Sequence, residues 1–176
     1  MRVVAGSLRG RRLQAPPGSD TRPTSDRVRE ATFNALASQD VLRDATVLDL
    51  FAGSGALGIE ALSRGAAHCT FVEQARPAIA AVRQNLDALG VADRATVVTM
   101  DVDRFLTSAA AGRFDLALAD PPYAYAGWTG LLDAVPAEVL VAESDRAIEP
   151  DDRWELVRTR RYGATHVTIL RRIPPP

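Results

Sequence analysis

The residues with the clearest chemical potential are Asp120-Pro121-Pro122-Tyr123, which directly follow the apolar run 114–119. Two successive prolines fix the backbone and remove two N–H donors, so the carbonyl groups there point in set directions. A carboxylate and such a carbonyl can together accept both hydrogens of a planar NH₂ group. Because the exocyclic amine of a nucleobase is a poor nucleophile, holding its nitrogen toward a methyl donor is the obvious way to activate it. The face of Tyr123 would let a flipped-out base stack beside the carboxylate.

The same four residues have a simpler interpretation, a rigid Pro-Pro turn with an aspartate cap. Their place after the fourth predicted strand, downstream of a glycine turn and two acids, favours the chemical interpretation. We therefore predict a site that orients an exocyclic amine.

A second motif spans residues 47–58 and reads as a strand, a glycine turn and the start of a helix. Gly53, Gly55 and Gly58 fit the pattern G-x-G-x-x-G, and Glu73 ends the next apolar run. In folds that bind adenosine cofactors, such glycines let the backbone approach the ligand, and the acid accepts hydrogen bonds from ribose hydroxyls. The combination favours an adenosine-type cofactor over a purely structural turn.

Asp49, just before this turn, distinguishes two classes of cofactor. Its carboxylate would repel the pyrophosphate of a nicotinamide dinucleotide but would favour the ammonium group of S-adenosylmethionine, which has no phosphate. The chain also leaves little room for the substrate domain of a dehydrogenase. We therefore expect S-adenosylmethionine.

Other polar side chains give weaker signals. Asp101 follows the apolar run 95–100 and is interpreted equally well as an acceptor for the adenine amino group or as a helix N-cap. Cys69 lies inside an apolar run, and a single cysteine provides neither an internal disulfide nor a metal-ligand cluster, so we interpret it as structural. His68 and His166 lack partners in the sequence, and we expect no metal.

Alternating apolar and helical patterns are expected to position these motifs. Continuous apolar runs separated by helices predict a parallel sheet that is covered on both faces. The last two strand candidates are separated by only three residues and should pair antiparallel. The predicted fold is α/β and Rossmann-like, a mostly parallel seven-stranded sheet with an antiparallel last strand. The expected strands are 47–51, 68–73, 95–100, 114–119, 139–143, 154–161 and 165–172, and the expected helices are 57–64, 77–89, 102–110 and one ending near 135.

The N-terminal residues are expected to form a small basic extension. Residues 2–14 predict a short hairpin with a glycine-containing turn, and Thr24 or Ser25 can cap a helix that has Asp26 in its first turn. We divide the chain into a hairpin, loop and helix extension (1–44), a catalytic domain (45–173) and a disordered tail (174–176).

Composition places the chain among globular proteins, since 47% of its 176 residues are hydrophobic and 24% are charged. It contains no apolar run of about 18 residues, as a membrane span requires, and its first residues lack the apolar segment of a secretory signal. We therefore expect a cytoplasmic protein without membrane association; we also expect a monomer, although no motif in the sequence determines the oligomeric state.

The charge is unevenly distributed although the net charge is only −1. All 21 basic residues are arginine; residues 1–30 carry a net charge of +4, residues 153–172 one of +5, and the middle one of −10. Basic ends around an acidic body suit a protein that binds a polyanion, and solvated charged faces are the alternative.

The motifs resemble those of class I amino-methyltransferases. Asp120-Pro121-Pro122-Tyr123 looks like their (Asp/Asn/Ser)-Pro-Pro-(Tyr/Phe) motif, and residues 49–55 look like their cofactor turn. Residues 2–13, the block RPTSDRVREATFN at 22–34 and RYGAT at 161–165 closely resemble the RsmD family. Members of that family methylate N2 of a guanine in the 16S rRNA of the small ribosomal subunit. Arginine replaces lysine throughout the N-terminal arm, which phosphate contacts tolerate.

The resemblance implies a direct methyl transfer from S-adenosylmethionine, without a covalent enzyme intermediate. Asp120 would orient the guanine amine, Pro121 would supply the carbonyl and Tyr123 would stack on the base, with Pro122 completing the catalytic motif. The loop 22–27 would lie over the cofactor and the target base. The predicted cofactor-binding residues are Thr24, Asp49, Phe51, Gly53, Gly55, Glu73, Asp101 and Val102. The predicted RNA-binding residues are Arg2, Arg9, Arg11, Arg12, Arg22, Arg27, Arg160 and Arg161.

Two other functions compete with RNA methylation. A DNA adenine-N6 methyltransferase could use the same four residues, but the chain has no target-recognition segment of useful size. A nucleic-acid-binding module without catalysis is disfavoured because Asp120, Glu73 and the central glycines are intact. The expected partner is 16S rRNA or the small ribosomal subunit. Tyr125 and Trp128 either frame the base or pack beneath the loop.

Overall fold

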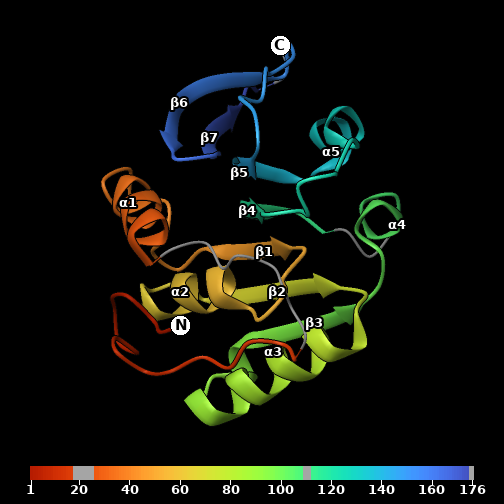
Figure 1. The fold of residues 1–176 in the computed structure, drawn as a ribbon. Helices are drawn as coiled ribbons and strands as arrows, with labels where there is room; N and C mark the ends of the chain where they lie inside the picture. Colours follow the sequence, from red (N-terminus) through yellow and green to blue (C-terminus); the bar gives the residue numbers. More distant parts are fainter. Residues whose placement is uncertain (18–25, 109–111, 175–176) are drawn as a thin grey trace.

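A seven-stranded sheet forms the centre of the computed structural model, which describes residues 1–17, 26–108 and 112–174. The strand order is β3-β2-β1-β4-β5-β7-β6 (Figure 1). The first five strands are parallel, and β7 lies antiparallel between β5 and β6. The predicted α/β sheet with its antiparallel last strand is confirmed. The strands are β1 (Thr46–Leu50), β2 (His68–Glu73), β3 (Ala95–Thr99), β4 (Phe114–Ala119), β5 (Ala137–Ser144), β6 (Trp154–Tyr162) and β7 (Thr165–Arg172).

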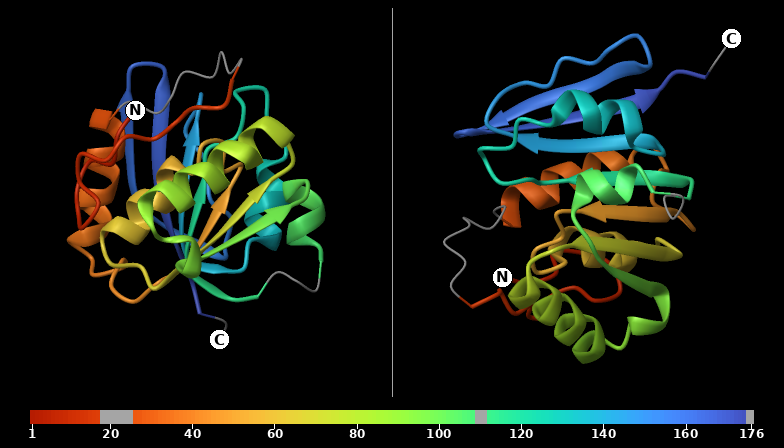
Figure 2. Two further views of the ribbon diagram at one scale, coloured as in Figure 1. Left: turned by 90° about the horizontal axis from the view of Figure 1, so that it is seen from below. Right: turned by 90° about the vertical axis from the view of Figure 1, so that its right-hand side faces the viewer.

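Helices cover both faces of the sheet (Figure 2). α1 (Asp26–Ala37), α2 (Ala56–Ser63) and α3 (Arg76–Leu89) lie on one face, and α4 (Val102–Leu106) and α5 (Trp128–Ala134) lie on the other. A short 3₁₀ helix, η1 (Ala92–Arg94), precedes β3. Of the helix predicted over 102–110, the structure has α4 up to Leu106, after which the hydroxyls of Thr107 and Ser108 bond to main-chain carbonyls of its last turn; residues 109–110 lie outside the described residues.

Alternate side chains of the central strands enter two separate cores. Leu116 and Leu118 of β4 pack under α1, α2 and α3, whereas Ala117 and Ala119 pack under α4 and α5. Cys69 of β2 is fully buried in the first core, and burial raises its thiol pKa, consistent with a structural cysteine. Of the helices in the described residues, none is long and apolar enough to cross a membrane.

The N-terminal residues pair with each other and then pack on the helical layer. Arg2 and Arg12 form one antiparallel bridge, so the predicted hairpin is present as a minimal pairing rather than as two strands. Val3 and Leu13 are buried in the same core as α1 and α2. The extension therefore shares its core with the sheet, and its separation as a unit at residue 44 stays a prediction.

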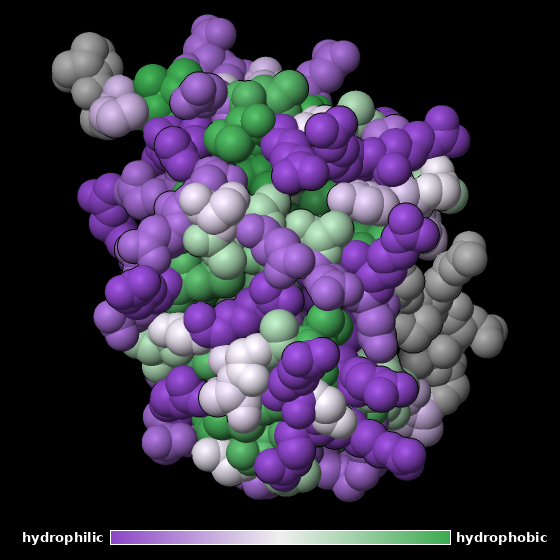
Figure 3. All heavy atoms as spheres, turned by 90° about the vertical axis from the view of Figure 1, so that its left-hand side faces the viewer, coloured by the Kyte–Doolittle hydropathy of each residue, from purple (hydrophilic) through white to green (hydrophobic). Residues whose placement is uncertain are grey.

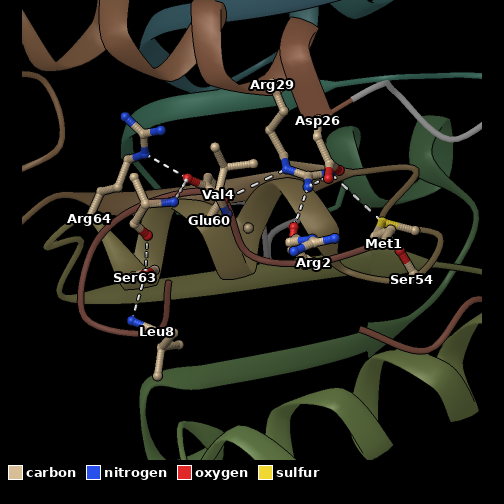
Figure 4. A network of polar contacts seen from close by, with 12 residues as sticks. Met1, Arg2, Val4, Leu8, Asp26, Arg29, Ser54, Glu60, Ser63 and Arg64 are labelled. Carbon is tan, nitrogen blue, oxygen red and sulfur yellow. Dashed lines mark hydrogen bonds and ion pairs between the residues drawn. The ribbon is translucent and has the colours of Figure 1, made fainter. Parts of the chain in front are cut away.

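Glu60 on α2 is a fully buried acid that holds this segment in place (Figure 4). Its carboxylate accepts the backbone N–H groups of Val4 and Ala5 at 2.8 and 3.0 Å. It also accepts the Arg64 guanidinium at 2.7 Å and lies 3.7 Å from Nε of the buried Arg29. Two cations and two N–H groups thus offset the cost of burying the charge.

Two further side chains complete the same network. The Arg29 guanidinium donates to the Arg2 carbonyl and to Asp26, and so connects α1 with the first residues of the chain. The Ser63 hydroxyl donates to the Ala5 carbonyl and accepts the Leu8 N–H at 3.0 Å. Long-range polar contacts rather than a regular sheet therefore fix the N-terminal segment.

We expect Gly58→Ala to destabilise the fold. A Cβ at Gly58 would lie 2.3 Å from Cε1 of Phe71 and 2.6 Å from Sγ of Cys69, so α2 would have to move away from β2. Overpacking of this kind costs about 1–3 kcal/mol of unfolding free energy, measurable by urea denaturation. The control is Gly130→Ala on α5, where none of the described residues lies within 4 Å of the added Cβ and alanine should be neutral or stabilising. Equal stability of the two variants would contradict the proposed close packing.

Candidate active site at the carboxyl ends of the central strands

The predicted acids meet at one edge of the sheet. Because β1 lies between β2 and β4, the chain changes direction at β1, and such switch points form ligand crevices at the carboxyl ends of the strands. Asp49 lies near the end of β1 and Glu73 ends β2. Asp101 follows β3 and Asp120 follows β4. The parallel register therefore brings together four carboxylates that are far apart in sequence.

The turn after β1 has the backbone that its sequence predicts. Gly53 and Gly55 have φ values of +58° and +78°, in the left-handed region that glycine tolerates. Phe51 also has a positive φ, +59°, which is strained for an aromatic residue. The Gly53 N–H donates to Oε2 of Glu73 at 3.0 Å, so the acid of β2 supports the turn directly. Among the described residues a Cβ on Gly53 would meet only the Phe51 carbonyl oxygen, at 3.9 Å, so glycine is needed there for its conformation rather than for space.

Asp49 lies beneath the turn and is only 1% exposed. Its Oδ2 accepts the Gly58 N–H at 2.9 Å, which ties the first turn of α2 to β1. Burial raises the pKa of Asp49 well above its ordinary value; the Gly58 hydrogen bond opposes this, while the charges of Asp120 and Glu73 add to it. The carboxylate therefore supports the turn, and its predicted attraction for an ammonium group stays a prediction.

Asn85 of α3 is a residue of this region that sequence analysis missed. Its side-chain amide donates to the carbonyls of Ser54 and Gln14 at 2.9 and 3.0 Å, and its oxygen accepts the Gln14 N–H at 2.8 Å. It therefore joins the glycine turn to the N-terminal segment. A signal was present, since Asn85 is a polar residue on the apolar stripe of α3 that also contains Val82 and Leu86.

The structure supports one interpretation of Asp101 directly. Its side chain accepts the Arg104 N–H at 3.1 Å and caps α4, so the N-cap interpretation is confirmed. The carboxylate remains exposed, and its contact with adenine stays a prediction. The Val102 side chain is buried in the second core, so only its backbone is available to a ligand.

The Asp-Pro-Pro-Tyr segment leaves β4 at the same edge. Asp120 is half-buried, Pro121 is buried, and Pro122 and Tyr123 are exposed, the tyrosine by 56%. The Tyr125 N–H bonds to the carbonyl of Pro122 at 2.8 Å and closes the turn. Among the described residues no backbone N–H bonds to the Pro121 carbonyl, and its role as an acceptor beside Asp120 stays a prediction.

Three aromatic residues connect the glycine turn with the segment after Asp120. The Tyr125 ring packs edge-on against the rings of Phe51 and Trp128, with centroid-to-centroid distances of 5.0 and 5.5 Å. Its hydroxyl donates to Asp103 of α4 at 2.9 Å, and both burial and this carboxylate raise the pKa of Tyr125. Trp128 is buried in the second core, in keeping with the packing interpretation.

The predicted arginines lie on two surfaces. On the N-terminal segment Arg2, Arg9, Arg11 and Arg12 are exposed, and the Arg11 guanidinium donates to the Ala88 carbonyl at 2.8 Å.

The second group comprises exposed residues of α1 and β6, namely Arg27, Arg160 and Arg161. Arg161 donates to the Gly163 carbonyl at 2.8 Å. Arg22, Thr24 and the helix cap at Thr24 or Ser25 lie outside the described residues, as do the last two residues of the predicted tail.

Comparison with known proteins gives consistent matches over nearly the whole chain. The family model described as Conserved hypothetical protein 95 matches residues 1–171. YlbH of Bacillus subtilis (strain 168) is 41% identical over 184 residues, covering 98% of this chain and 99% of that protein. Ribosomal RNA small subunit methyltransferase D of Escherichia coli (strain K12) is 44% identical over 123 residues, covering 70% and 60% of the two chains. The solved structure of yhhF from Escherichia coli has 36% identity and a TM-score of 0.84, covering 98% and 97%.

We expect Asp49→Asn to change how stability depends on pH. Since burial raises the folded-state pKa of Asp49 above 3.8, the folded protein holds a proton that the unfolded chain releases between the two pKa values. The free energy of unfolding therefore falls as pH rises from the unfolded-state pKa to the folded-state pKa of Asp49. With asparagine at this position, which does not titrate, this decrease does not occur. The stability of Asp49→Asn relative to the original chain should rise from about pH 4 and level off above the folded-state pKa, as measured by urea unfolding at a series of pH values. A pH-independent difference would contradict the burial of a titrating carboxyl group.

Proposed function

Because the chain belongs to the RsmD family, described as Conserved hypothetical protein 95, we propose that it methylates the N2 amine of a guanine in the 16S rRNA of the small ribosomal subunit. The observation that carries the proposal is the Asp120-Pro121-Pro122-Tyr123 segment beside the glycine turn at the switch point of the sheet. Family membership supports methyl transfer to ribosomal RNA, and the chemistry of this segment supports an amine as the acceptor.

The residues around the glycine turn fit S-adenosylmethionine. Gly53 and Gly55 let the backbone approach a ligand, Glu73 ends β2 where ribose hydroxyls need an acceptor, and Asp101 is exposed at the end of β3. This donor set has carboxylates where a pyrophosphate would need N–H groups or cations. The bound cofactor supplies a methyl group on a positively charged sulfur. The same carboxylates favour that charge and the ammonium group of the cofactor.

Asp120 and the Pro121 carbonyl would accept the two hydrogens of the guanine amine and direct its nitrogen toward the methyl group. For this the side chain of Asp120 acts only as a hydrogen-bond acceptor, which is the role of a carboxylate. S-adenosylmethionine would supply the methyl group to the nitrogen that Asp120 and the Pro121 carbonyl hold in place, and the amine proton would leave to water. The exposed ring of Tyr123 is available to stack on a base that has left its helix.

Phosphate contacts from the arginines would supply affinity for RNA. Arginine binds phosphate through a planar, bidentate guanidinium, and such contacts position nucleic acid without reading its sequence. The choice of RNA over DNA rests on the family and on the printed name of the Escherichia coli relative. The alternative, adenine-N6 methylation of DNA, would use the same Asp120 geometry and is tested by the same experiment.

The test is transfer of labelled methyl from S-adenosylmethionine to unmethylated small ribosomal subunits, naked 16S rRNA and duplex DNA, followed by nucleoside analysis. We expect label in N2-methylguanosine from the subunit or the rRNA. Asp120→Ala should lower transfer by at least 100-fold, since about 7–11 kcal/mol of a barrier can depend on alignment. Cofactor affinity, measured by calorimetry, should change little because Asp120 acts on the amine.

Other outcomes of this experiment are equally informative. Label in N6-methyladenine from DNA would overturn the substrate but not the role of Asp120. Loss of cofactor binding in Asp120→Ala would reassign that residue to the cofactor. Absence of transfer to all three acceptors, with intact cofactor binding, would reject the proposed substrate class.

Replacing both Arg9 and Arg12 by glutamine should weaken binding to rRNA and reduce its dependence on salt. Each lost phosphate contact lowers the slope of log affinity against log salt by about 0.7–0.9. The measurement is filter binding at several salt concentrations. Arg43→Gln is the control, because Arg43 is exposed but lies outside the basic ends of the chain. An unchanged slope in the double variant would show that Arg9 and Arg12 of the N-terminal segment do not contact the RNA phosphates.

A further inference from the structure

A groove between α1 and the outer strands of the sheet contains Arg158 beside Arg160, of which only Arg160 is among the RNA-binding residues predicted above. Ala31, Thr32 and Ala35 of α1 line one side, Arg158, Arg160 and Tyr162 of β6 line the other, and β7 forms the floor. Figure 3 shows the face that carries α1, where strongly hydrophilic residues surround paler and weakly hydrophobic surface.

A β-bulge turns the two arginines toward α1. Leu156 pairs with Leu170, which belongs to the core under α4 and α5. After a register shift, Arg158 pairs with Ile169 and Arg160 with Val167, two residues of the core under α1. Without the extra residue, Val157 and Thr159 would occupy those positions, since side chains alternate along a strand. Bulges commonly re-aim side chains in this way near functional sites.

The side chains that line the groove include hydrogen-bond donors without a partner among the described residues. Within the described parts of the chain, neither Arg158 nor Arg160 has an acidic partner within 4.0 Å, whereas exposed arginines such as Arg113 and Arg153 are paired. The Thr32 hydroxyl is buried and has no hydrogen-bond partner in the described residues. The alanine side chains opposite the arginines are too short to block the groove. These groups suit an anion that accepts hydrogen bonds.

The groove begins next to the candidate active site. β6 runs parallel to β4, because both are antiparallel to the direction of β7, so the end of β6 at Tyr162 lies at the same sheet edge as Asp120. The Tyr123 hydroxyl lies 3.5 Å from Oγ1 of Thr165, the first residue of β7, which pairs with Tyr162 at the end of β6. A strand of nucleic acid that places a base against Tyr123 can therefore continue into the groove.

We propose that the groove binds the sugar–phosphate backbone of the RNA segment that flanks the target guanine, with Arg158 and Arg160 contacting successive phosphates. Arg158 and Arg160 are two residues apart on one face of β6, so their Cα atoms are separated by about 6.6 Å. This inference rests on the proposed function, because it names the part of the RNA substrate that lies outside the catalytic pocket. An acidic protein segment is the alternative occupant. RNA is favoured because Tyr123 contacts the beginning of β7 beside the end of β6, so nucleotides flanking a base at Tyr123 can reach the groove.

The test is the double variant Arg158→Gln/Arg160→Gln, assayed for binding to naked 16S rRNA and to small ribosomal subunits. We expect the slope of log affinity against log salt to fall by about 1.4 for single-stranded RNA, with a loss of affinity of about 10-fold near physiological salt. The matched control, Arg113→Gln/Arg146→Gln, removes the same charge from exposed arginines outside the groove and should leave both quantities unchanged. Cofactor affinity should be the same in all proteins.

Two outcomes would overturn the inference. If the double variant binds naked rRNA with an unchanged slope of log affinity against log salt, the groove does not contact the RNA backbone. Loss of affinity for subunits but not for naked rRNA would assign the groove to an acidic ribosomal protein. Failure of the original chain to methylate any RNA would instead reject the proposed function, so the two failures are distinguishable.

A second measurement is independent of these arginines. An iron chelate on Ala31→Cys should cleave rRNA beside the methylated guanine, and the natural Cys69 does not interfere because it is fully buried. The same chelate on Gly130→Cys of α5, across the sheet, is the control. Equal cleavage patterns from both sites, or none beside the guanine from Ala31→Cys, would contradict the proposed path.

Discussion

The hydrogen bond from Gly58 to the buried carboxylate of Asp49 is the contact on which the candidate site depends. It fixes the first turn of α2 over the end of β1, and the missing side chain of Gly58 lets α2 approach β2 closely. The glycine turn between these elements then has little freedom, and Glu73 secures its outer part through Gly53. A buried acid is costly, but here its hydrogen bond positions the backbone that a cofactor would contact.

The N-terminal segment is coupled to this arrangement by polar contacts rather than by a sheet. Glu60 and Ser63 bind its backbone to α2, and Asn85 joins Gln14 to the carbonyl of Ser54 in the glycine turn. A segment that bears exposed arginines is thereby attached to the element that would hold the cofactor. RNA contacts on the segment and cofactor contacts on the turn would consequently be positioned by the same helices.

The sequence allowed the fold and the position of the acids to be predicted, because both depend on local patterns. Apolar runs identified each strand and placed Asp49, Glu73, Asp101 and Asp120 at or near the ends of four of them, and the parallel strand order brings those ends to one edge. Partners distant in sequence could not be predicted in this way. The contact between Asn85 and Gln14 spans 71 residues. The sequence of β6 likewise does not distinguish a bulged strand from a regular one, although the bulge determines which side chains of the strand face α1.

The distribution of charge reconciles two conflicting electrostatic demands. Carboxylates at the centre of the site suit a positively charged cofactor and a neutral amine, but they repel the phosphates of the RNA that carries the amine. Arginines placed around the site, on the N-terminal segment and on β6, can attract those phosphates without neutralising the central acids. Screening limits exposed charges to about 8–10 Å, so in the proposed complex the arginines would act on the flanking backbone while Asp120 would act on the base. A near-neutral chain can in this way bind a polyanion at its periphery and orient an uncharged amine at its centre.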